Sequence, residues 1–548
     1  MGVPIALYVL ALVARGVAAV LFPDPAYPDS SYYVDVARSI VSGHGFSVDF
    51  IWIFPEVGGH IPANPVLPIP SNAHWMPLSS IVQVPFLAVL GQTAIAAVIP
   101  FVVVGALAAP MTWALAREAG AEEWVARGAG VLVAIPALLL PFMAQPDNFG
   151  LYQPLVVGAL WMGARGLKGD RRAFALAGLL AGGATLARND GVLVLGTLGL
   201  AFLWDRWRAW RSRGSRLPAI PFATAMLCVA LFAVVMVPWY LRQLAVFGTL
   251  SPSTASGKVF FIRSIDEWNS ISTPATLDHL LGMGLGPLLQ TRLDGLLAAL
   301  GIFAVLAGAL LLAPFMLVGA WRRRRSVDFG PFFVYAIVLF AFSAILSAVH
   351  VPGGTFIHSA CALVPYSYVL ALEGIAAGAG WIAARRPSWD AAQASRVFGG
   401  AAVGVAIVGG IGATWTVHLT WDATRQQQVA IGAALDAAGA PASDRLMSID
   451  AAGFRYWTGH GGVVLVNDPL ETIESVAVAY DIRWLALQRG DTVPAMEPVL
   501  DHDQRPSWLG PAVASATDDQ GRTTWGLYPV CTAAGDPRCE ALATAPVP

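Results

Sequence analysis

The chain has 548 residues, of which 56% are hydrophobic and 12% are charged, with a mean hydropathy of +0.62. Soluble domains carry about 25% charged residues, so this composition excludes an ordinary soluble enzyme and a fibrous or disordered chain. The formal net charge of −2 provides no strong field for nucleic acid. The composition indicates an integral membrane protein with a modest soluble part.

Eleven apolar runs come close to the roughly 20 residues that a helix needs to cross a bilayer. They predict a polytopic all-α membrane protein with spans at 5–22, 94–116, 125–143, 149–165, 172–187, 189–205, 218–240, 295–320, 329–349, 357–384 and 396–418. The first run lacks the basic segment and the cleavage site of a signal peptide, so we expect it to stay as an anchor. The run at 77–90 is too short to cross and predicts an interfacial or re-entrant helix.

The distribution of Lys and Arg between alternate connections predicts the orientation. Eighteen of these cations lie in five short connections, whereas six lie in the opposite set, which includes two long loops at 23–93 and 241–294. Short cytoplasmic loops are enriched in Lys and Arg. We therefore expect a cytoplasmic N-terminus, with both long loops and the whole tail on the other side.

The tail, 421–548, has more charge and shorter apolar runs than the part before it. It predicts a small extracytoplasmic α/β domain after a membrane domain at 1–420, with helices at 421–439 and 470–480 and strands at 445–449, 463–466, 482–487 and 523–530. Cys531 and Cys539 lie close together in this tail, where an oxidising compartment permits a disulfide. The spacing leaves both the bonded and the reduced state open.

Ionisable residues collect in the predicted external loops, where they favour a functional role. Asp29 follows the first span and precedes a helix expected at about 30–41, for which Asp29 or Ser30 would be the N-cap. Simple capping is thus the structural alternative for Asp29. The fourth external loop, 241–294, is long enough to be functional. A purely structural cap is the alternative.

Several short motifs follow one another along the predicted external side. They are Asp29 followed by Tyr32-Tyr33 and Ala37-Arg38, Gly43-His44-Gly45-Phe46, His74-Trp75-Met76-Pro77-Leu78, Gln145-Pro146-Asp147-Asn148, Leu186 to Gly191, and Pro238-Trp239-Tyr240-Leu241-Arg242. In this order they resemble membrane glycosyltransferases of the GT-C superfamily. The resemblance is greatest to the group of protein O-mannosyltransferases and lipid A aminoarabinose transferases, which is similar to glycosyltransferase family 39, and it covers about residues 1–420.

The resemblance implies an inverting glycosyltransferase that moves a sugar from a polyprenyl-phosphate carrier to an acceptor hydroxyl. The acceptor would be a lipid, a glycan or a protein at the extracytoplasmic face of a bacterial plasma membrane. The loop 241–294 would then be a lid over the acceptor entrance. Asp29 matches the catalytic position, which suits a carboxylate that takes the hydroxyl proton. Arg188 and Arg242 match carrier-phosphate positions, because a guanidinium fork fits phosphate oxygens.

Departures from the family pattern give two further expectations. Relatives carry two adjacent acidic residues where this chain has Asp29-Ser30, so Asp147 or Asp35 would supply a second carboxylate or orient the acceptor. His358 stands where relatives have an Arg-Tyr segment, and it would offer a titratable contact to the carrier phosphate.

The resemblance also implies that His74, Tyr32 and Tyr33 line the cavity. Arg188 has the alternative of an interfacial anchor paired with Asp190, and Asp147 that of a turn residue. His74 has the alternative of pairing with a backbone carbonyl.

Cofactors and the class of function remain as alternatives. No zinc-ligand spacing is present in the sequence, so we assign no metal site and no certain cofactor. A divalent cation stays open because metal dependence varies within the superfamily. The alternative function is a non-catalytic transporter of lipid-linked saccharides or a membrane assembly partner. An oligosaccharyltransferase is disfavoured because the tail has no Trp-Trp-Asp motif.

Overall fold

The computed structural model describes residues 2–52, 59–212, 217–308, 310–386 and 388–531. Contacts divide the chain into two units. The first comprises 1–24, 75–242 and 289–418, and the second comprises 25–74, 243–288 and 419–548. The two units are described in turn.

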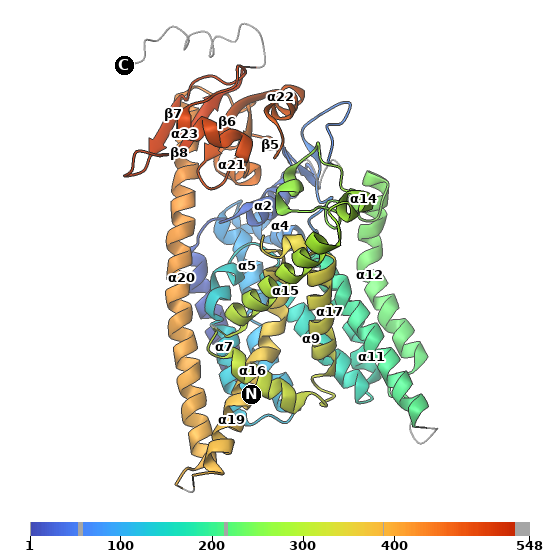
Figure 1. Cartoon of the computed structure of the whole chain (residues 1–548). Helices are drawn as coiled ribbons and strands as arrows, with labels where there is room; N and C mark the ends of the chain where they lie inside the picture. The colour runs from blue at the N-terminus through green and yellow to red at the C-terminus, as the bar shows by residue number, and fades with distance from the viewer. Residues whose placement is uncertain (1, 53–58, 213–216, 309, 387, 532–548) are drawn as a thin grey trace. The chain divides into compact units, whose positions relative to one another are not determined.

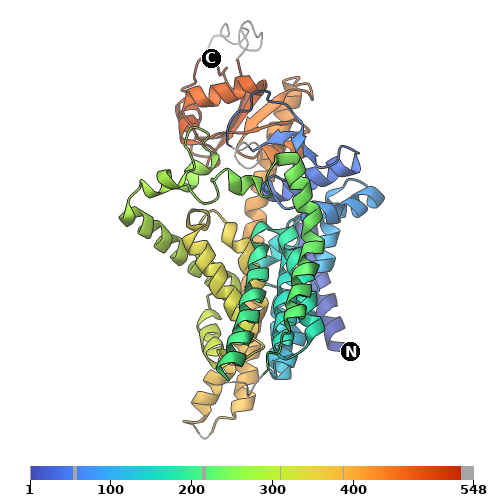
Figure 2. The ribbon, with the colours of Figure 1, turned by 90° about the vertical axis from the view of Figure 1, so that its right-hand side faces the viewer.

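The first unit consists of helices, most of which run alongside one another (Figures 1 and 2). From the N-terminus onward they are α1 (Gly2–Leu21), α4 (Leu78–Leu90), α5 (Ala94–Gly105), α6 (Ala108–Glu118), α7 (Glu123–Ala134), α8 (Leu140–Met143) and α9 (Phe149–Leu167). They continue with α10 (Arg171–Ala187), α11 (Val192–Arg211), α12 (Phe222–Phe247), α15 (Leu285–Gly308), α16 (Ala313–Arg323), α17 (Gly330–Ile345), α18 (Thr355–Ala360), α19 (Val364–Ala383) and α20 (Ala391–Ala437). The end of α12, the start of α15 and the last part of α20 belong to the second unit.

Seven helical stretches of the described chain are long and apolar enough to cross a membrane. They are Gly2–Leu21, Ala94–Glu118, Glu123–Met143, Phe222–Phe247, Leu285–Ala307, Thr355–Ala383 and Ala391–Ala437. The predicted count of eleven spans is thus confirmed in part, and crossings by α9, α10, α11 and α17 stay predictions. The short helix expected at 77–90 is present as α4.

Two predicted helix boundaries are wrong. The single span expected at 295–320 is two helices, α15 and α16, because Pro314 lies in the first turn of α16, where proline favours a helix start. The helix expected at 421–439 is the end of α20, which runs on from the last span. Residues 413–430 contain neither Gly nor Pro, so nothing in this stretch stops the helix.

The second unit is built on a six-stranded sheet in the order β2-β5-β4-β6-β8-β7. Its strands are β2 (Phe50–Ile51), β4 (Arg445–Ser448), β5 (Gly462–Val464), β6 (Ile482–Gln488), β7 (Ala514–Thr517) and β8 (Thr523–Pro529). The first four in this order are parallel, and β8 and β7 add an antiparallel edge. Strand β6 is almost continuously apolar and buried, as expected of a strand covered on both faces.

Helices α21 (Ala451–Thr458), α22 (Leu470–Ala479) and α23 (Glu497–His502) connect these strands (Figure 1). A core cluster joins Ile431 and Leu435 of α20 to Leu446, Trp484 and Leu527 of the sheet. The small sheet predicted for the tail is therefore confirmed. Strand β2 comes from the first long loop, which short-range sequence patterns did not indicate.

The long loops contain more regular structure than expected. The first includes α2 (Pro28–Val41) and a ribbon of β1 (Ser47–Val48) and β3 (Ile69–Pro70). The helix starts at Pro28 with Tyr27 as N-cap, so the expectation of Asp29 or Ser30 as N-cap is wrong. The second is shorter than 241–294, because α12 and α15 extend into it, and it holds α13 (Pro252–Ala255), a 3-10 turn at Ile265–Asn269 and α14 (Leu277–Leu281).

Candidate functional site

The predicted site residues are distributed over both units. The first unit holds Asp147, Arg188, Arg242 and His358, and the second holds Asp29, Tyr32, Tyr33, Asp35 and His74. The first unit brings three of its four residues together, namely Asp147, Arg188 and His358, in a polar cluster formed by the ends of α9, α10 and α18. We call these three, with Asn148, Asp190 and Ser359, the Arg188 cluster.

Arg188 is placed by a tight turn at the end of α10. The helix stops at Ala187, and Arg188 adopts an extended conformation before a 3-10 turn at Asn189–Gly191. A Cβ atom at Gly191 would lie 2.4 Å from the carbonyl of Ala184. Only glycine permits this close return of the turn to α10, which places Asp190 beside Arg188.

The guanidinium of Arg188 joins three groups. Its Nε lies 2.9 Å from Asp190 Oδ1 and donates to Ser359 Oγ at 2.9 Å, and Nη2 donates to the carbonyl of Thr355 at 3.0 Å. Ser359 also donates its hydroxyl proton to Asp190. The ion pair that the anchor alternative requires is thus present, but contacts with α18 also fix the direction of the fork. A cation held in this way is preorganised for an anion.

His358 lies on α18, which begins after Gly354 in the left-handed region at φ 95°. Its Nδ1 lies 3.2 Å from Asn148 Oδ1 and 3.5 Å from Asp147 Oδ2, and its ring stacks on Phe149 at 4.3 Å. Both neighbouring atoms are acceptors, so we assign the proton to Nδ1. This assignment leaves Nε2 as the ring atom that accepts a proton or binds a cation.

Asp147 is fully buried in the turn between α8 and α9. Its Oδ1 accepts the backbone N–H of the next residue, Asn148, at 2.5 Å within this turn. The turn alternative for Asp147 is therefore realised, and the same side chain also lies beside His358. A carboxylate and an imidazole suit a divalent transition metal, so Asp147 and His358 are candidates to share one.

An open apolar pocket of about 310 Å³, called the apolar cavity below, lies in the first unit. It is lined by Leu138, Phe142, Gly301, Ile302, Val305, Leu306 and Ile357. Ile357 precedes His358 on α18, and the ring of Phe142 contacts that of Phe149, which stacks on His358. Adjacent side chains therefore connect the apolar cavity with the Arg188 cluster.

Arg242 and the aromatic residues occupy other positions. The guanidinium of Arg242 lies over the ring of Trp239 at 5.0 Å, near the end of α12. Tyr32 and Tyr33 are almost fully buried, and the hydroxyl of Tyr32 accepts the N–H of Asn72 at 2.7 Å. His74 contacts Trp268 edge-on at 5.5 Å. A cavity-lining role for these three stays a prediction.

Asp29 lies in the first turn of α2, where the helix dipole favours a carboxylate. Ser30, next to it, accepts the N–H groups of Ala26 and Tyr27 at 3.1 and 3.2 Å and thereby closes the start of the helix. The charge of Asp29 contributes to raising the pKa of Asp450, so the two carboxylates are near enough to interact.

Asp35, further along α2, belongs to a group of opposed charges between α2 and α21. Arg38 Nη1 lies 4.0 Å from Asp35 Oδ1, and Arg455 Nε lies 3.3 Å from Asp49 Oδ2. Burial raises the pKa of Asp35 to about 7, with Arg38 and Arg455 opposing the rise and Asp450 and Asp49 adding to it. Asp35 is therefore largely protonated below neutral pH.

Asp450 is also buried, and it is bound through both oxygens. It accepts the N–H of Gly453 at 2.8 Å and the amide of Gln428 at 2.6 Å. Burial raises its pKa to about 6, and these hydrogen bonds limit the rise. These contacts make Asp450 the N-cap of α21, which is a structural role.

Comparisons with known proteins agree with the motif order. Residues 74–239 match the family model described as dolichyl-phosphate-mannose-protein mannosyltransferase. The structure of ArnT from Cupriavidus metallidurans bound to undecaprenyl phosphate is similar over 97% of this chain and 98% of its own, with 14% identity and a TM-score of 0.56. The chain has the GT-C glycosyltransferase fold. The predicted resemblance is thereby confirmed.

A second GT-C structure is similar over less of its own length. It is the archaeal oligosaccharyltransferase AglB from Archaeoglobus fulgidus, in complex with an inhibitory peptide and a dolichol-phosphate. The similarity covers 88% of this chain and 69% of AglB, with 14% identity and a TM-score of 0.52. No curated protein sequence matches the chain.

Several polar residues of the chain were missed by the sequence patterns. Ser359 and Asn148 join the Arg188 cluster, and each is the chain neighbour of a residue that was expected. Asp450 and Asp468 of the tail had no motif that marked them. Whether Cys531 pairs with Cys539 stays open, since Cys539 lies outside the described residues.

Proposed function

We propose that this GT-C chain is an inverting glycosyltransferase that moves a sugar from a polyprenyl-phosphate carrier to an acceptor hydroxyl. The observation that carries the proposal is the Arg188 cluster beside an apolar cavity. A polyprenyl phosphate combines an anionic head with an apolar chain, so it needs both kinds of surface. GT-C structures in complex with undecaprenyl phosphate and with dolichol-phosphate support this class of ligand.

The proposed reaction is a single displacement at the anomeric carbon. The acceptor oxygen forms a bond to this carbon while the bond from the carbon to the phosphate oxygen breaks. The hydroxyl proton passes to the carboxylate of Asp29, and the electron pair of the broken bond stays on the leaving phosphate. Attack from the face opposite the leaving group inverts the configuration.

Arg188 would stabilise the negative charge that grows on the leaving phosphate. Its fork is held by Asp190, Ser359 and the carbonyl of Thr355 before any ligand arrives, so little reorganisation is needed. His358 would add a neutral or charged contact from the same helix that bears Ser359. Arg242 and a second carboxylate from Asp147 or Asp35 keep the roles that the family resemblance implies.

A divalent cation would supply Lewis-acid stabilisation of the same phosphate charge. Asp147 and His358 would fit such an ion with the ring proton moved to Nε2, because the ring atom that lies 3.5 Å from Asp147 Oδ2 is Nδ1. The orientation also belongs to the proposal. The N-terminus would be cytoplasmic, and the long loops and the tail would face the extracytoplasmic side of a bacterial plasma membrane.

Binding of undecaprenyl phosphate to the purified chain in nanodiscs tests the carrier site. Arg188→Lys keeps the charge but loses the fork, so we expect binding about tenfold weaker, with Arg188→Ala weaker still. Arg127→Lys is the matched control, because Arg127 is a more exposed residue paired with Glu123. Equal affinities for the wild type and both Arg188 variants would contradict the assignment of this site.

A further inference from the structure

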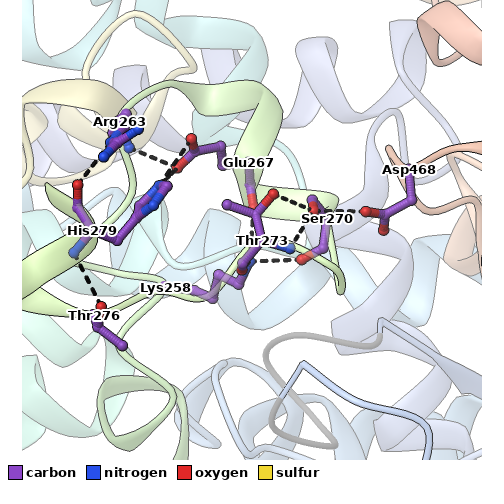
Figure 3. Close-up of polar contacts among 8 residues, drawn as sticks. All are labelled: Lys258, Arg263, Glu267, Ser270, Thr273, Thr276, His279 and Asp468. Carbon is purple, nitrogen blue, oxygen red and sulfur yellow. Dashed lines mark hydrogen bonds and ion pairs between the residues drawn. The ribbon is translucent and has the colours of Figure 1, made fainter. Parts of the chain in front are cut away.

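The segment 258–279 of the second long loop is held by a connected set of polar contacts (Figure 3). At one end Glu267 binds His279 Nε2 at 3.0 Å and accepts the N–H of Arg263 at 2.9 Å. Arg263 in turn donates to the carbonyl of His279 at 2.7 Å. These contacts close the loop on itself around the 3-10 turn at Ile265–Asn269.

Lys258 holds the middle of the segment. Its side chain is buried, and its ammonium donates to the carbonyls of Glu267, Ser270 and Thr273 at 3.2, 2.6 and 2.7 Å. Burial lowers the pKa of Lys258 to about 8, against the opposing effects of Asp468 and Glu267, so the group stays mostly protonated at neutral pH. The single ammonium of Lys258 thus donates hydrogen bonds to three backbone carbonyls of the segment.

Asp468 binds the same segment from the tail. It lies between β5 and α22, and its carboxylate accepts the N–H of Ile271 at 2.6 Å and the hydroxyl of Ser270 at 2.7 Å. It also accepts the N–H and the hydroxyl of Ser272. Figure 3 shows Asp468 approaching Ser270 from the opposite side to Lys258. The carboxylate therefore fixes three consecutive loop residues to the connection between β5 and α22.

The fixed segment carries side chains that meet the first long loop. Asn269 accepts the indole N–H of Trp52 at 2.5 Å, and Trp268 contacts the ring of His74. The neighbour of Asp468, Asn467, donates its backbone N–H to the carbonyl of Asn269 at 2.9 Å and its side-chain amide to that of Asp266. Residues from three separate parts of the chain thus depend on one loop conformation.

We propose that Lys258 and Asp468 are positioning residues that latch the second loop to the tail, so that Trp268 and Asn269 present a fixed surface, with His74 and Trp52, to the acceptor. This inference rests on the proposed glycosyltransferase function. The latch acts through the loop and takes no part in the chemical step. Loss of either member leaves buried donors or acceptors without partners, so the loop would open while the sheet stays folded.

Hydrogen exchange of the full chain in nanodiscs tests the latch without any ligand. In Asp468→Asn and Lys258→Met we expect amides of 266–273 to exchange at least about tenfold faster, with β4 and β6 unchanged. Asp518→Asn is the matched control, because Asp518 pairs with Arg522 in an exposed turn of the same tail. Asp468→Glu keeps the carboxylate and should restore part of the protection. Unchanged exchange at 266–273 in both latch variants would overturn the proposal.

Initial rates separate the latch from the proposed function. With dolichyl phosphate mannose and a Ser/Thr peptide as probes, Asp468→Asn should raise the KM for the peptide at least about fivefold and leave kcat within about twofold. Faster exchange with an unchanged peptide KM would overturn the positioning role and leave the proposed function intact. If the wild type transfers no mannose from this donor to this peptide, while hydrogen exchange in the latch variants is faster as expected, the result counts against the proposed function with these two substrates. It does not count against the latch.

Discussion

Asp35 provides the prediction that the structure specifies most fully. Its carboxyl lies between α2 and α21, with the side chain 12% exposed. Burial raises its pKa to about 7 from 3.8, despite the nearby Arg38 and Arg455. Replacement by Asn keeps the size and the polarity of the side chain and removes the ionisation. We therefore expect Asp35→Asn to stabilise the second unit at alkaline pH.

The sign follows from the two pKa values. Below 3.8 the carboxyl is protonated whether the chain is folded or unfolded, so the substitution has no electrostatic effect. Between 3.8 and about 7 the unfolded chain releases the proton and the folded chain keeps it, so the wild type loses stability as the pH rises. Above about 7 the loss is complete. At 1.36 kcal/mol for each pH unit it amounts to at most about 4 kcal/mol.

Thermal unfolding in detergent between pH 4 and pH 8 measures this effect. For a unit of this size 4 kcal/mol corresponds to a change in Tm of the order of 10 °C, so Asp35→Asn should melt well above the wild type at pH 8 and level with it at pH 4. Asp518→Asn is the control, because backbone and side-chain hydrogen bonds from Arg522 lower the pKa of Asp518. The control should gain nothing at pH 8. A Tm of Asp35→Asn at or below that of the wild type at pH 8 would show that the ionised carboxyl of Asp35 does not destabilise the folded unit.

Two further predictions concern the first unit. Val305→Phe should fill part of the apolar cavity and weaken the binding of undecaprenyl phosphate about tenfold. Binding of inorganic phosphate, measured by competition, should be unchanged. Equal losses of affinity for both ligands would contradict the binding of the polyprenyl chain in this cavity. His358→Phe keeps the stack on Phe149 but removes the Nδ1 donor to Asn148 and Asp147, so it should lower the free energy of unfolding by about 1–3 kcal/mol. In thermal melts His358→Asn should lie closer to the wild type. A Tm unchanged by His358→Phe would show that this donor is not needed for stability.

Local chain signals predicted the helices better than their ends. Apolar runs marked the helices because burial in lipid requires them, and the loop motifs led to the GT-C fold. The break before α16 followed from Pro314, which a window average conceals. The extension of α20 to Ala437 followed from the absence of a stop signal, although composition changes near residue 420. Strand β2 has two residues, and its pairing with β5 links segments about 410 residues apart, which no local pattern can show.

The residues of the candidate site were likewise predicted only in part from the sequence. The family resemblance pointed to Arg188, His358 and Asp147, and the structure then showed that they share one cluster. Their partners Ser359 and Asn148 are polar residues of ordinary kinds, which become significant only through proximity. Asp468 is another example, because its role depends on loop residues about 200 positions earlier. Asp35 was expected as a second carboxylate, and this role stays a prediction; the raised pKa of its buried carboxyl could not be read from the sequence.

Sugar transfer by Asp29→Asn is the most direct test of the central claim. The wild type and the variant in nanodiscs would be given radiolabelled polyprenyl-phosphate sugars together with membrane acceptors, and release of free polyprenyl phosphate would be measured. We expect transfer by the wild type and a rate of transfer about 10²–10⁴-fold lower in Asp29→Asn. Binding of undecaprenyl phosphate should be retained in the variant. Transfer by Asp29→Asn at the wild-type rate would contradict the assignment of Asp29 as the base. Binding without transfer in the wild type would favour a transporter.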